Sequence, residues 1–328
     1  MKESMLPNAT ATPQTQWEQC INRTADKVEF VFVSVYVLVF IAGLILNLVA
    51  LAVFFCLTKT RSHTTVYMTN LAVADLLLVC MLPVRIYYHL GFRRLPQLLC
   101  EVTNMVLLMN MYGSILLLSC MSVDRAMAVC FPMSARVRQT RKKAPLACLV
   151  IWLLTVSTSV PIYISRAQGS QQAQCFGSFP AYATRTVVVS SSLTLGFGGP
   201  LIALLVSSWG LIRAVRQSQA AQMDLVDTRK IQRMVAACLL IFLACFLPYH
   251  LSLWLIYVNR TSVPCSLVDG YRYGLMVACL NAMLDPLAYY FTTETFRQRV
   301  GNSVRRQMRP ITQGQSSDDN NRSRALNT

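Results

Sequence analysis

The sequence predicts an all-α membrane protein in which seven helices cross the bilayer, and three observations predict it. First, the 328 residues are 54% hydrophobic and only 13% charged, whereas soluble globular domains carry roughly a quarter charged residues. Second, the chain contains repeated apolar stretches that are nearly free of charge and exceed the ~20 residues that a transmembrane helix requires. Third, basic residues are concentrated in alternate connecting segments, as in a multi-pass membrane protein.

The predicted spans follow these stretches in chain order. The stretches without Asp, Glu, Lys or Arg are residues 30–58, 102–123, 144–165, 186–212 and 234–259. Two further apolar stretches hold one acid each, Asp75 in residues 66–84 and Asp285 in residues 273–291. One apolar run alone is also compatible with a buried helix of a soluble protein, but seven in succession leave too little polar sequence to solvate one. We therefore expect a seven-helix bundle over residues 28–292.

The basic residues predict which side of the membrane each segment occupies. About two thirds of the 30 Lys and Arg residues lie in four segments. These are residues 57–65, 124–143, 213–233 and the tail after residue 292. Because Lys and Arg concentrate in cytoplasmic loops, residues 1–27 are expected outside the plasma membrane. The sequons at Asn8, Asn22 and Asn259 then also lie outside. The net charge of +16 is explained by topology and membrane lipids, so it does not indicate nucleic-acid binding.

The residues after the seventh span predict a helix on the membrane surface. Within residues 293–308, Phe296, Val300 and Val304 recur at four-residue spacing with arginines between them. This pattern is typical of an amphipathic helix that lies in the interface. Residues 309–328 are polar and predict a disordered cytoplasmic tail.

The twelve cysteines divide between the spans and the loops. Most lie inside the spans, where a thiol behaves as a small apolar residue. Cys20, Cys100, Cys175 and Cys265 lie on the predicted outer side, where oxidising conditions favour pairing. Four cysteines allow three different connectivities. None of them has the spacing of metal ligands.

A set of landmark residues, one for each helix, relates the chain to a known family. The landmarks are Asn47 in "LILNLVA", Asp75 in "NLAVADLL", Asp124-Arg125 in "MSVDR", Trp152, Pro200, Pro248 in "CFLPYH" and "DPLAYY" at 285–290. With them the chain resembles the class A (rhodopsin-like) G-protein-coupled receptors over residues 28–308. The resemblance implies a receptor with a heterotrimeric G protein and arrestin as partners. It also implies the disulfides Cys100–Cys175 and Cys20–Cys265.

The resemblance places a conformational switch in the inner half of the bundle. Its residues are Asp124, Arg125, Phe246, Pro248, Asp285, Pro286 and Tyr289. Arg125 is expected to be neutralised at rest by Asp124 and by carbonyls, and to reorient when the sixth helix swings outward. The alternative is an interfacial charge cluster, because arginine near a helix end can snorkel at little cost. Ala126 and Ser208 stand where the family commonly has tyrosine, which leaves open a weakly coupled orphan receptor.

Acids inside a membrane span are costly and usually functional. By the same resemblance, Asp75, Ser114, Asn281 and Asp285 form a sodium pocket at the centre of the bundle. Two carboxylates close together require a cation or a proton. A hydrogen-bonded polar cluster without an ion is the alternative. No cofactor and no metal other than this allosteric sodium ion is expected.

Outer arginines predict an anionic ligand. The stretches "NMYGSILLLSCMSVDR", "LPVRIYYHL" and "LDPLAYYFTTETF" are similar to the lysophosphatidic acid receptors of the purinergic-like branch. The arginines around the second helix and the outer loops are Arg85, Arg93, Arg94, Arg166, Arg185, Arg260 and Arg272. A guanidinium can bind phosphate oxygens through two parallel bonds. Arg85 lies inside its helix beside Tyr88 and His89, so we expect it to hold the phosphate with Arg260 and Arg272, although snorkelling is an alternative.

Apolar residues near these arginines predict where a lipid chain would lie. Met105, Met109 and Tyr249 are expected to form an adaptable lining that suits an acyl chain. A lysophospholipid, with lysophosphatidic acid first, is therefore the predicted ligand. Methionines at helical spacing are also common in ordinary packing. A nucleotide or another anionic ligand is the alternative.

Other functional classes fit the sequence less well. A transporter or channel predicts repeated halves or several charged residues at the membrane midplane, and the sequence shows neither. An enzyme needs a nucleophile and a base within reach, or metal ligands. The histidines His63, His89 and His250 are scattered along the chain. We therefore expect a receptor and not an enzyme.

Overall fold

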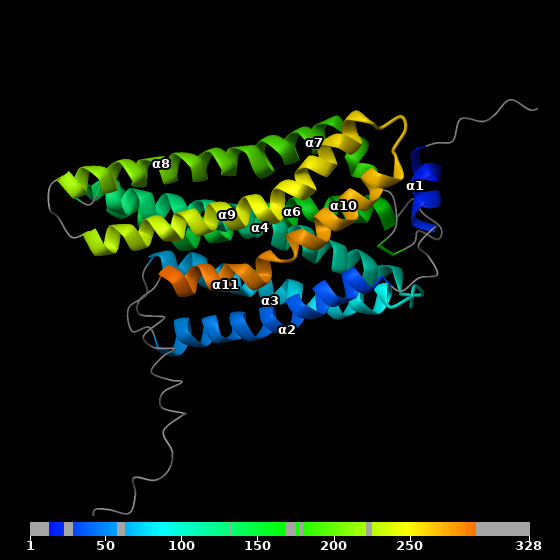
Figure 1. Cartoon of the computed structure of the whole chain (residues 1–328), viewed down its shortest axis with the longest axis horizontal. Coiled ribbons are helices and arrows are strands. Elements are labelled where there is room, and N and C mark those ends of the chain that lie inside the picture. Colours follow the sequence, from blue (N-terminus) through cyan, green and yellow to red (C-terminus); the bar gives the residue numbers. More distant parts are fainter. Residues whose placement is uncertain are drawn as a thin grey trace, which may run out of the picture.

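The structure is a computed structural model that describes residues 13–22, 29–57, 63–131, 133–167, 175–176, 180–220 and 225–292. These residues form helices joined by turns, with no strand among them. The long helices run side by side along one axis (Figure 1). The prediction of an all-α seven-helix bundle is therefore confirmed.

The spans follow the predicted order along the chain. The first four are α2 (Phe30–Ala52) with its π-helical continuation η1 (Val53–Leu57), α3 (His63–His89), α4 (Gln97–Cys130) and α6 (Ala144–Ala167). The fifth comprises α7 (Thr186–Ser191), η3 (Ser192–Gly198) and α8 (Gly199–Ala220). The sixth is α9 (Leu225–Val258), and the seventh combines α10 (Cys265–Ala278) and α11 (Asn281–Thr292). Three short helices lie outside the spans: α1 (Pro13–Asn22), α5 (Ala135–Arg141) and the 3₁₀ helix η2 (Ala181–Thr184).

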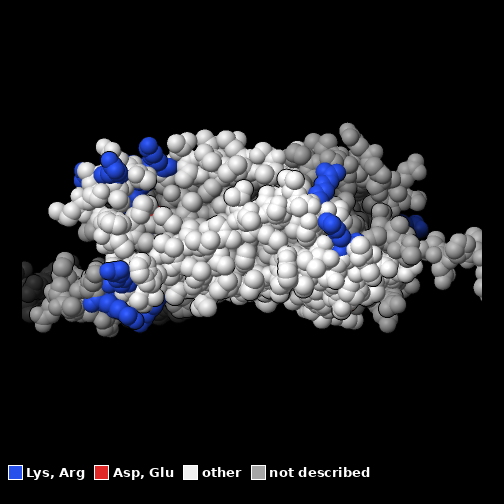
Figure 2. All heavy atoms as spheres, turned by 90° about the horizontal axis from the view of Figure 1, so that it is seen from above, with Lys and Arg blue, Asp and Glu red and all other residues white. Residues whose placement is uncertain are grey.

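The side of the bundle has the surface of a protein embedded in lipid. Five of the described helices are each long and apolar enough to cross a membrane, and α6, which is bent by 45° from the preceding α5, supplies a sixth crossing. Leu153, Val206 and Leu240 point outward and are 62%, 60% and 68% exposed. On the face shown in Figure 2, Lys and Arg gather toward both ends and leave an uncharged stretch between them. The chain is thus a multi-pass membrane protein.

The seventh span breaks at Cys279 and Leu280, where the amides donate to carbonyls three residues earlier, as in a 3₁₀ turn. Further along, Pro286 has no N–H and cannot donate to the carbonyl oxygen of Ala282. Asn47 of α2 takes that place, because its Nδ2 donates to this oxygen at 2.7 Å. The landmark asparagine therefore satisfies a backbone group that proline leaves free, and it ties the first span to the seventh.

The fifth span widens into the π-helix η3 just before Pro200. The ring of Tyr112 from α4 packs against Gly196 in this wide turn, where an added Cβ would lie only 2.8 Å from the ring. The Tyr112 hydroxyl and Ser192 Oγ lie 2.6 Å apart. A glycine at this position therefore lets α4 and the fifth span approach closely.

Two disulfides mark one end of the bundle, which we call the disulfide end. Cys100–Cys175 joins α4 to the segment before η2, and Cys20–Cys265 joins α1 to α10. In both bridges the Cα atoms are 5.3 Å apart. The two pairs are those that the family resemblance implies. Trp17 of α1 is buried against an aromatic ring of α10, so α1 is packed on this end as well as tethered to it.

Some predictions concern residues that the structure does not describe. Asn8, the amphipathic helix at 293–308 and the tail at 309–328 lie outside the described residues. Asn22 ends α1, although its side chain is not described, and Asn259 is exposed in the turn after α9. Glycosylation and the domain boundaries stay predictions.

Candidate ligand-binding site

A pocket opens at the disulfide end and encloses about 400 Å³ of space, part of it shared with solvent. Residues of α3, α4, η2 and α10 line it, together with the segment bridged to Cys100. The lining residues are Arg85, Asn104, Leu107, Leu108, Cys175, Phe176, Pro180, Tyr182, Tyr271 and Leu275.

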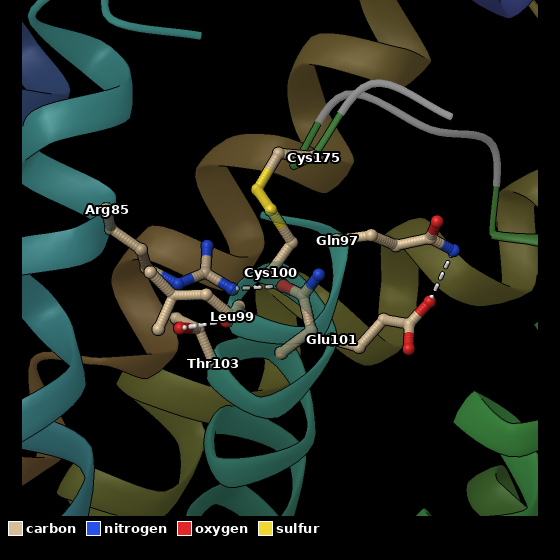
Figure 3. The surroundings of a disulfide bond; sticks show 8 residues. Arg85, Gln97, Leu99, Cys100, Glu101, Thr103 and Cys175 are labelled. Atoms are coloured by element: carbon tan, nitrogen blue, oxygen red, sulfur yellow. Dashed lines mark hydrogen bonds between the residues drawn. A yellow bond between two sulfur atoms is a disulfide. The ribbon is translucent and has the colours of Figure 1, made fainter. Parts of the chain in front are cut away.

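Arg85 supplies the positive charge of this pocket. Its side chain points from α3 toward α4 and the disulfide (Figure 3), and the residue is only 4% exposed. Its Nη2 donates to Oδ1 of Asn104 at 2.6 Å, and its guanidinium carbon lies 4.5 Å from the centre of the Phe176 ring. Its Nε is buried without a partner among the described residues. Because a buried guanidinium without a carboxylate is costly, this arrangement favours an anion in the pocket.

The remaining walls of the pocket are apolar and aromatic. Leu107 and Leu108 face it from α4, and Leu275 faces it from α10. Hydroxyl groups connect the aromatic wall, because Tyr182 is hydrogen-bonded to Tyr271 and its oxygen lies 3.4 Å from that of Tyr249. Tyr249, predicted to contact ligand, is fully buried behind this wall, where it contacts Tyr182 and the ring of Tyr271.

The residues of α4 that line this pocket are neighbours of the two methionines predicted to contact ligand. Asn104, Leu107 and Leu108 are three and four residues apart and share one face. Met105 and Met109 are half-buried beside that face and do not line the described pocket. Apolar composition alone could not predict the rotation of α4 about its axis, and this rotation decides which of its residues line the pocket.

A second group of charges ties together the helix ends beside the pocket. Nη2 of Arg272 donates to Oε1 and Oε2 of Glu29 at 2.5 and 2.6 Å, and His89 Nδ1 lies 2.5 Å from Oε2. The Phe32 ring stacks on His89 and lies 5.0 Å from the Arg272 guanidinium carbon. Burial raises the pKa of Glu29, but hydrogen bonds and charge from His89 and Arg272 outweigh it and lower this pKa to about 2. Arg272 is thus already neutralised by a carboxylate that the sequence analysis did not identify.

The other predicted cations lie away from the described pocket. Arg185 and Arg260 are exposed, and the Arg260 guanidinium carbon lies 5.0 Å from the Tyr257 ring centre. Arg94 is exposed, and Arg93 lies over the ring of Tyr88. The side chain of Arg166 lies outside the described residues. Tyr88 is buried edge-on against Phe176, so it supports the ring that covers Arg85.

A buried polar cluster occupies the centre of the bundle. Asp75, Ser114, Asn281 and Asp285 are all fully buried, as the resemblance implies for a sodium pocket. Asn110, which the prediction missed, donates to Oδ1 of Asp75 at 2.9 Å. Among the described residues, Asp75 Oδ2, Ser114 Oγ and both carboxylate oxygens of Asp285 have no hydrogen-bond partner. Buried carboxylate and hydroxyl oxygens of this kind fit a hard cation.

The predicted switch has a different ion pair from the expected one. Asp124 binds Arg141 of α5, with Nε to Oδ1 at 2.7 Å and Nη2 to Oδ2 at 3.2 Å, and Thr64 Oγ1 donates to Oδ2 at 2.9 Å. Arg125 forms no ion pair among the described residues, and its Nε is buried without a partner. The reason is geometric, because consecutive residues on a helix point in different directions. A basic residue on a neighbouring helix, such as Arg141 of α5, is better placed to reach the Asp124 carboxylate.

The other switch residues belong to α9 and α11. Phe246 is fully buried edge-on against Phe242 in α9. Pro248 lies inside α9 and Pro286 inside α11. Tyr289 belongs to α11, but its side chain is outside the described residues.

Comparisons with known proteins agree with this architecture. Residues 46–289 match the family model described as "7 transmembrane receptor (rhodopsin family)". The chain is 36% identical to lysophosphatidic acid receptor 6 of Mus musculus over 280 residues, 80% of each chain. It is 34% identical to lysophosphatidic acid receptor 4 of Homo sapiens over 278 residues, 81% of this chain and 75% of that one. It is 31% identical to the uracil nucleotide/cysteinyl leukotriene receptor of Rattus norvegicus over 311 residues, 92% of this chain and 90% of that one. The chain therefore belongs to the rhodopsin family of seven-transmembrane, G-protein-coupled receptors, in the branch of the lysophosphatidic acid and purinergic receptors.

Proposed function

We propose that this receptor binds a single-chain anionic lipid of the lysophospholipid class and couples the binding to activation of a heterotrimeric G protein. The observation that carries the proposal is Arg85, a buried cation in the pocket that donates to a neutral amide and has no carboxylate partner among the described residues. Charge-assisted hydrogen bonds to such a cation contribute ~1.5 to 3 kcal/mol each. Lysophosphatidic acid is the first candidate, because two of the relatives above carry its name.

The walls of the pocket support a lipid more than a nucleotide. Leu107, Leu108 and Leu275 offer apolar contact beside the cation. Each methylene buried against such surface contributes about 0.8 kcal/mol. Arg260 and Arg272 are assigned a smaller role than the sequence suggests, because the first is exposed and the second is paired with Glu29.

The second candidate is a nucleotide or another anionic ligand. The relative named as a uracil nucleotide/cysteinyl leukotriene receptor favours it, since it matches over 92% of this chain. The same Arg85 would serve either phosphate or carboxylate.

We place the disulfide end outside the plasma membrane and the end with Asp124 and Arg141 in the cytoplasm. Disulfides persist on the oxidising side of the membrane, and the basic segments predict the same orientation. The G protein, and arrestin as a second partner, would then bind at the cytoplasmic end. Anionic membrane lipids would contact the basic residues there.

The test is G-protein activation in cells that express the full chain. Lysophosphatidic acids of increasing acyl length, uridine and adenine nucleotides, and an uncharged monoacylglycerol are applied at matched surface expression. The proposal predicts activation by lysophosphatidic acid, with potency that rises with chain length, and no response to the uncharged lipid. Activation by nucleotides with no response to any lysophospholipid would reject the lipid and leave the second candidate.

A further inference from the structure

We propose that Asn104 is a positioning residue that holds Arg85 in place without neutralising it, and so reserves the positive charge of the pocket for an anionic ligand. The inference rests on the proposed function, because it concerns the same pocket. Asn104 and Arg85 both line the pocket, and Oδ1 of Asn104 accepts the Nη2 hydrogen bond at 2.6 Å.

Two other arginines in the same structure show the contrast. Arg272 donates to both carboxylate oxygens of Glu29, and Arg141 donates to both carboxylate oxygens of Asp124. Each of these guanidinium groups is bound by an opposite charge. Arg85 is more deeply buried than Arg141, yet no carboxylate pairs with it among the described residues, and its hydrogen bond to α4 is to an amide. An amide fixes the direction of one N–H but leaves the net charge uncompensated.

The disulfide holds this arrangement from two sides. Asn104 lies four residues after Cys100 on α4, so it is one helical turn below the bridge. Phe176 follows Cys175 directly and covers the guanidinium group, 4.5 Å from its carbon. Figure 3 shows Arg85 reaching toward α4 beneath the sulfur atoms, while Gln97 and Glu101 extend to the other side. The guanidinium group is therefore confined by the amide on α4 and the ring above it, and its Nε has no hydrogen-bond partner among the described residues.

Asparagine and aspartate have nearly the same shape, so exchanging them tests charge and not packing. In Asn104→Asp, the new carboxylate would bind Arg85 as Glu29 binds Arg272, and it would compete with the ligand. Asn104→Ala would free Arg85 without neutralising it. Asn104→Asp should therefore weaken anion binding more than Asn104→Ala, an order that a loss of packing would not produce. Gln97→Glu is the matched control, because Gln97 is exposed and bonded to Glu101, away from Arg85.

The first measurement is the thermal midpoint of the purified full chain with dodecyl phosphate and with uncharged dodecanol. Dodecyl phosphate is expected to raise the midpoint of the parent and of Gln97→Glu equally. The rise should be reduced in Asn104→Ala and lost in Asn104→Asp and Arg85→Ala, while dodecanol affects all variants alike. An equal rise in Asn104→Asp and Asn104→Ala, or no rise in the parent, would overturn the inference.

The second measurement is activation of a G protein by oleoyl lysophosphatidic acid in cells, corrected for surface expression. Asn104→Asp should raise the half-maximal concentration by roughly tenfold or more, and Asn104→Ala by only a few fold. The two proposals fail in different ways. If dodecyl phosphate stabilises the chain as expected but lysophosphatidic acid does not activate it, the lipid assignment is wrong and the role of Asn104 stands. If lysophosphatidic acid activates the chain and both Asn104 variants respond equally, the role of Asn104 is wrong and the lipid assignment stands.

Discussion

At the scale of single residues, Arg85 and Arg272 show how one residue type takes two roles through its partner. Both lie toward the disulfide end of the bundle and both are largely buried. The carboxylate of Glu29 makes Arg272 part of the framework, whereas the amide of Asn104 leaves Arg85 charged toward the pocket. Electrostatic complementarity with an anion is therefore expected at Arg85.

Substituting Arg85 tests its role directly. Arg85→Ala is expected to raise the half-maximal concentration of lysophosphatidic acid by roughly tenfold to a hundredfold, because a charge-assisted bond is lost. Arg85→Lys should recover only part of the potency lost in Arg85→Ala, because lysine keeps the charge but lacks the planar pair of donors of a guanidinium group. The measurement is a dose–response curve at matched surface expression, with Arg94→Ala at an exposed position as control. An unchanged curve for Arg85→Ala would contradict this role.

Glu29 predicts a pH dependence of stability. Its pKa is lowered from 4.5 to about 2, so its contribution is complete above about pH 4.5 and is lost as the pH falls toward 2. Glu29→Gln is therefore expected to lower the thermal midpoint of the purified chain at neutral pH. The difference from the parent should shrink as the pH falls through this window. Glu101→Gln, which removes a carboxylate bonded to Gln97, is the control. A difference that stays constant with pH would show that the ion pairs do not stabilise the fold.

At the scale of helices, the breaks and bulges are built around groups from neighbouring helices. The gap that Pro286 leaves in the seventh span is filled by Asn47 from the first, and the wide turn of η3 is filled by the ring of Tyr112. At the opposite end, the pair of Asp124 and Arg141 holds α5 to α4. Each irregular segment thus has a specific partner that a regular helix would not need.

Asn47 and Pro286 can be tested together. Asn47→Ala is expected to destabilise the bundle by about 1–3 kcal/mol, because the Ala282 carbonyl oxygen is left buried and unpaired. In the Pro286→Ala background an amide is restored at position 286, which can bond this oxygen as in a regular helix. The cost of Asn47→Ala should therefore be smaller there, as measured by unfolding of the four variants of the cycle. If Asn47→Ala destabilises the bundle equally in both backgrounds, Asn47 does not act through the carbonyl oxygen that Pro286 leaves free.

At the scale of the whole molecule, the central polar cluster brings together buried side chains of α3, α4 and α11. We propose that sodium binds Asp75 and Asp285 and favours the resting state. Agonist affinity is then expected to fall when sodium replaces N-methylglucamine at constant ionic strength, because an ion shifts the equilibrium toward the state that binds it better. Asp75→Asn should abolish the effect. The control Asp269→Asn, at an exposed position, should retain it. An affinity that does not depend on sodium in the parent would reject the proposal.

The sequence by itself determined the class of fold, the number of spans and the cysteine pairs that the resemblance implied. It could do so because lipid offers no hydrogen-bond partners to the backbone. A helix of about 20 apolar residues crosses the bilayer and satisfies its own backbone hydrogen bonds. It also singled out Arg85, one residue after the apolar stretch 66–84 and inside the same predicted helix, since a charge without an anionic partner is costly there.

Only the tertiary structure decided which side chains meet. Arg272 and Glu29 are 243 residues apart in sequence, and Asn47 and Ala282 are 235 apart. No local pattern relates such positions. The face of α4 that lines the pocket, Asn104 with Leu107 and Leu108 rather than Met105 and Met109, depends on the rotation of that helix about its axis. Hydropathy is nearly the same on all sides of a buried apolar helix, so the packing of neighbouring helices sets this rotation.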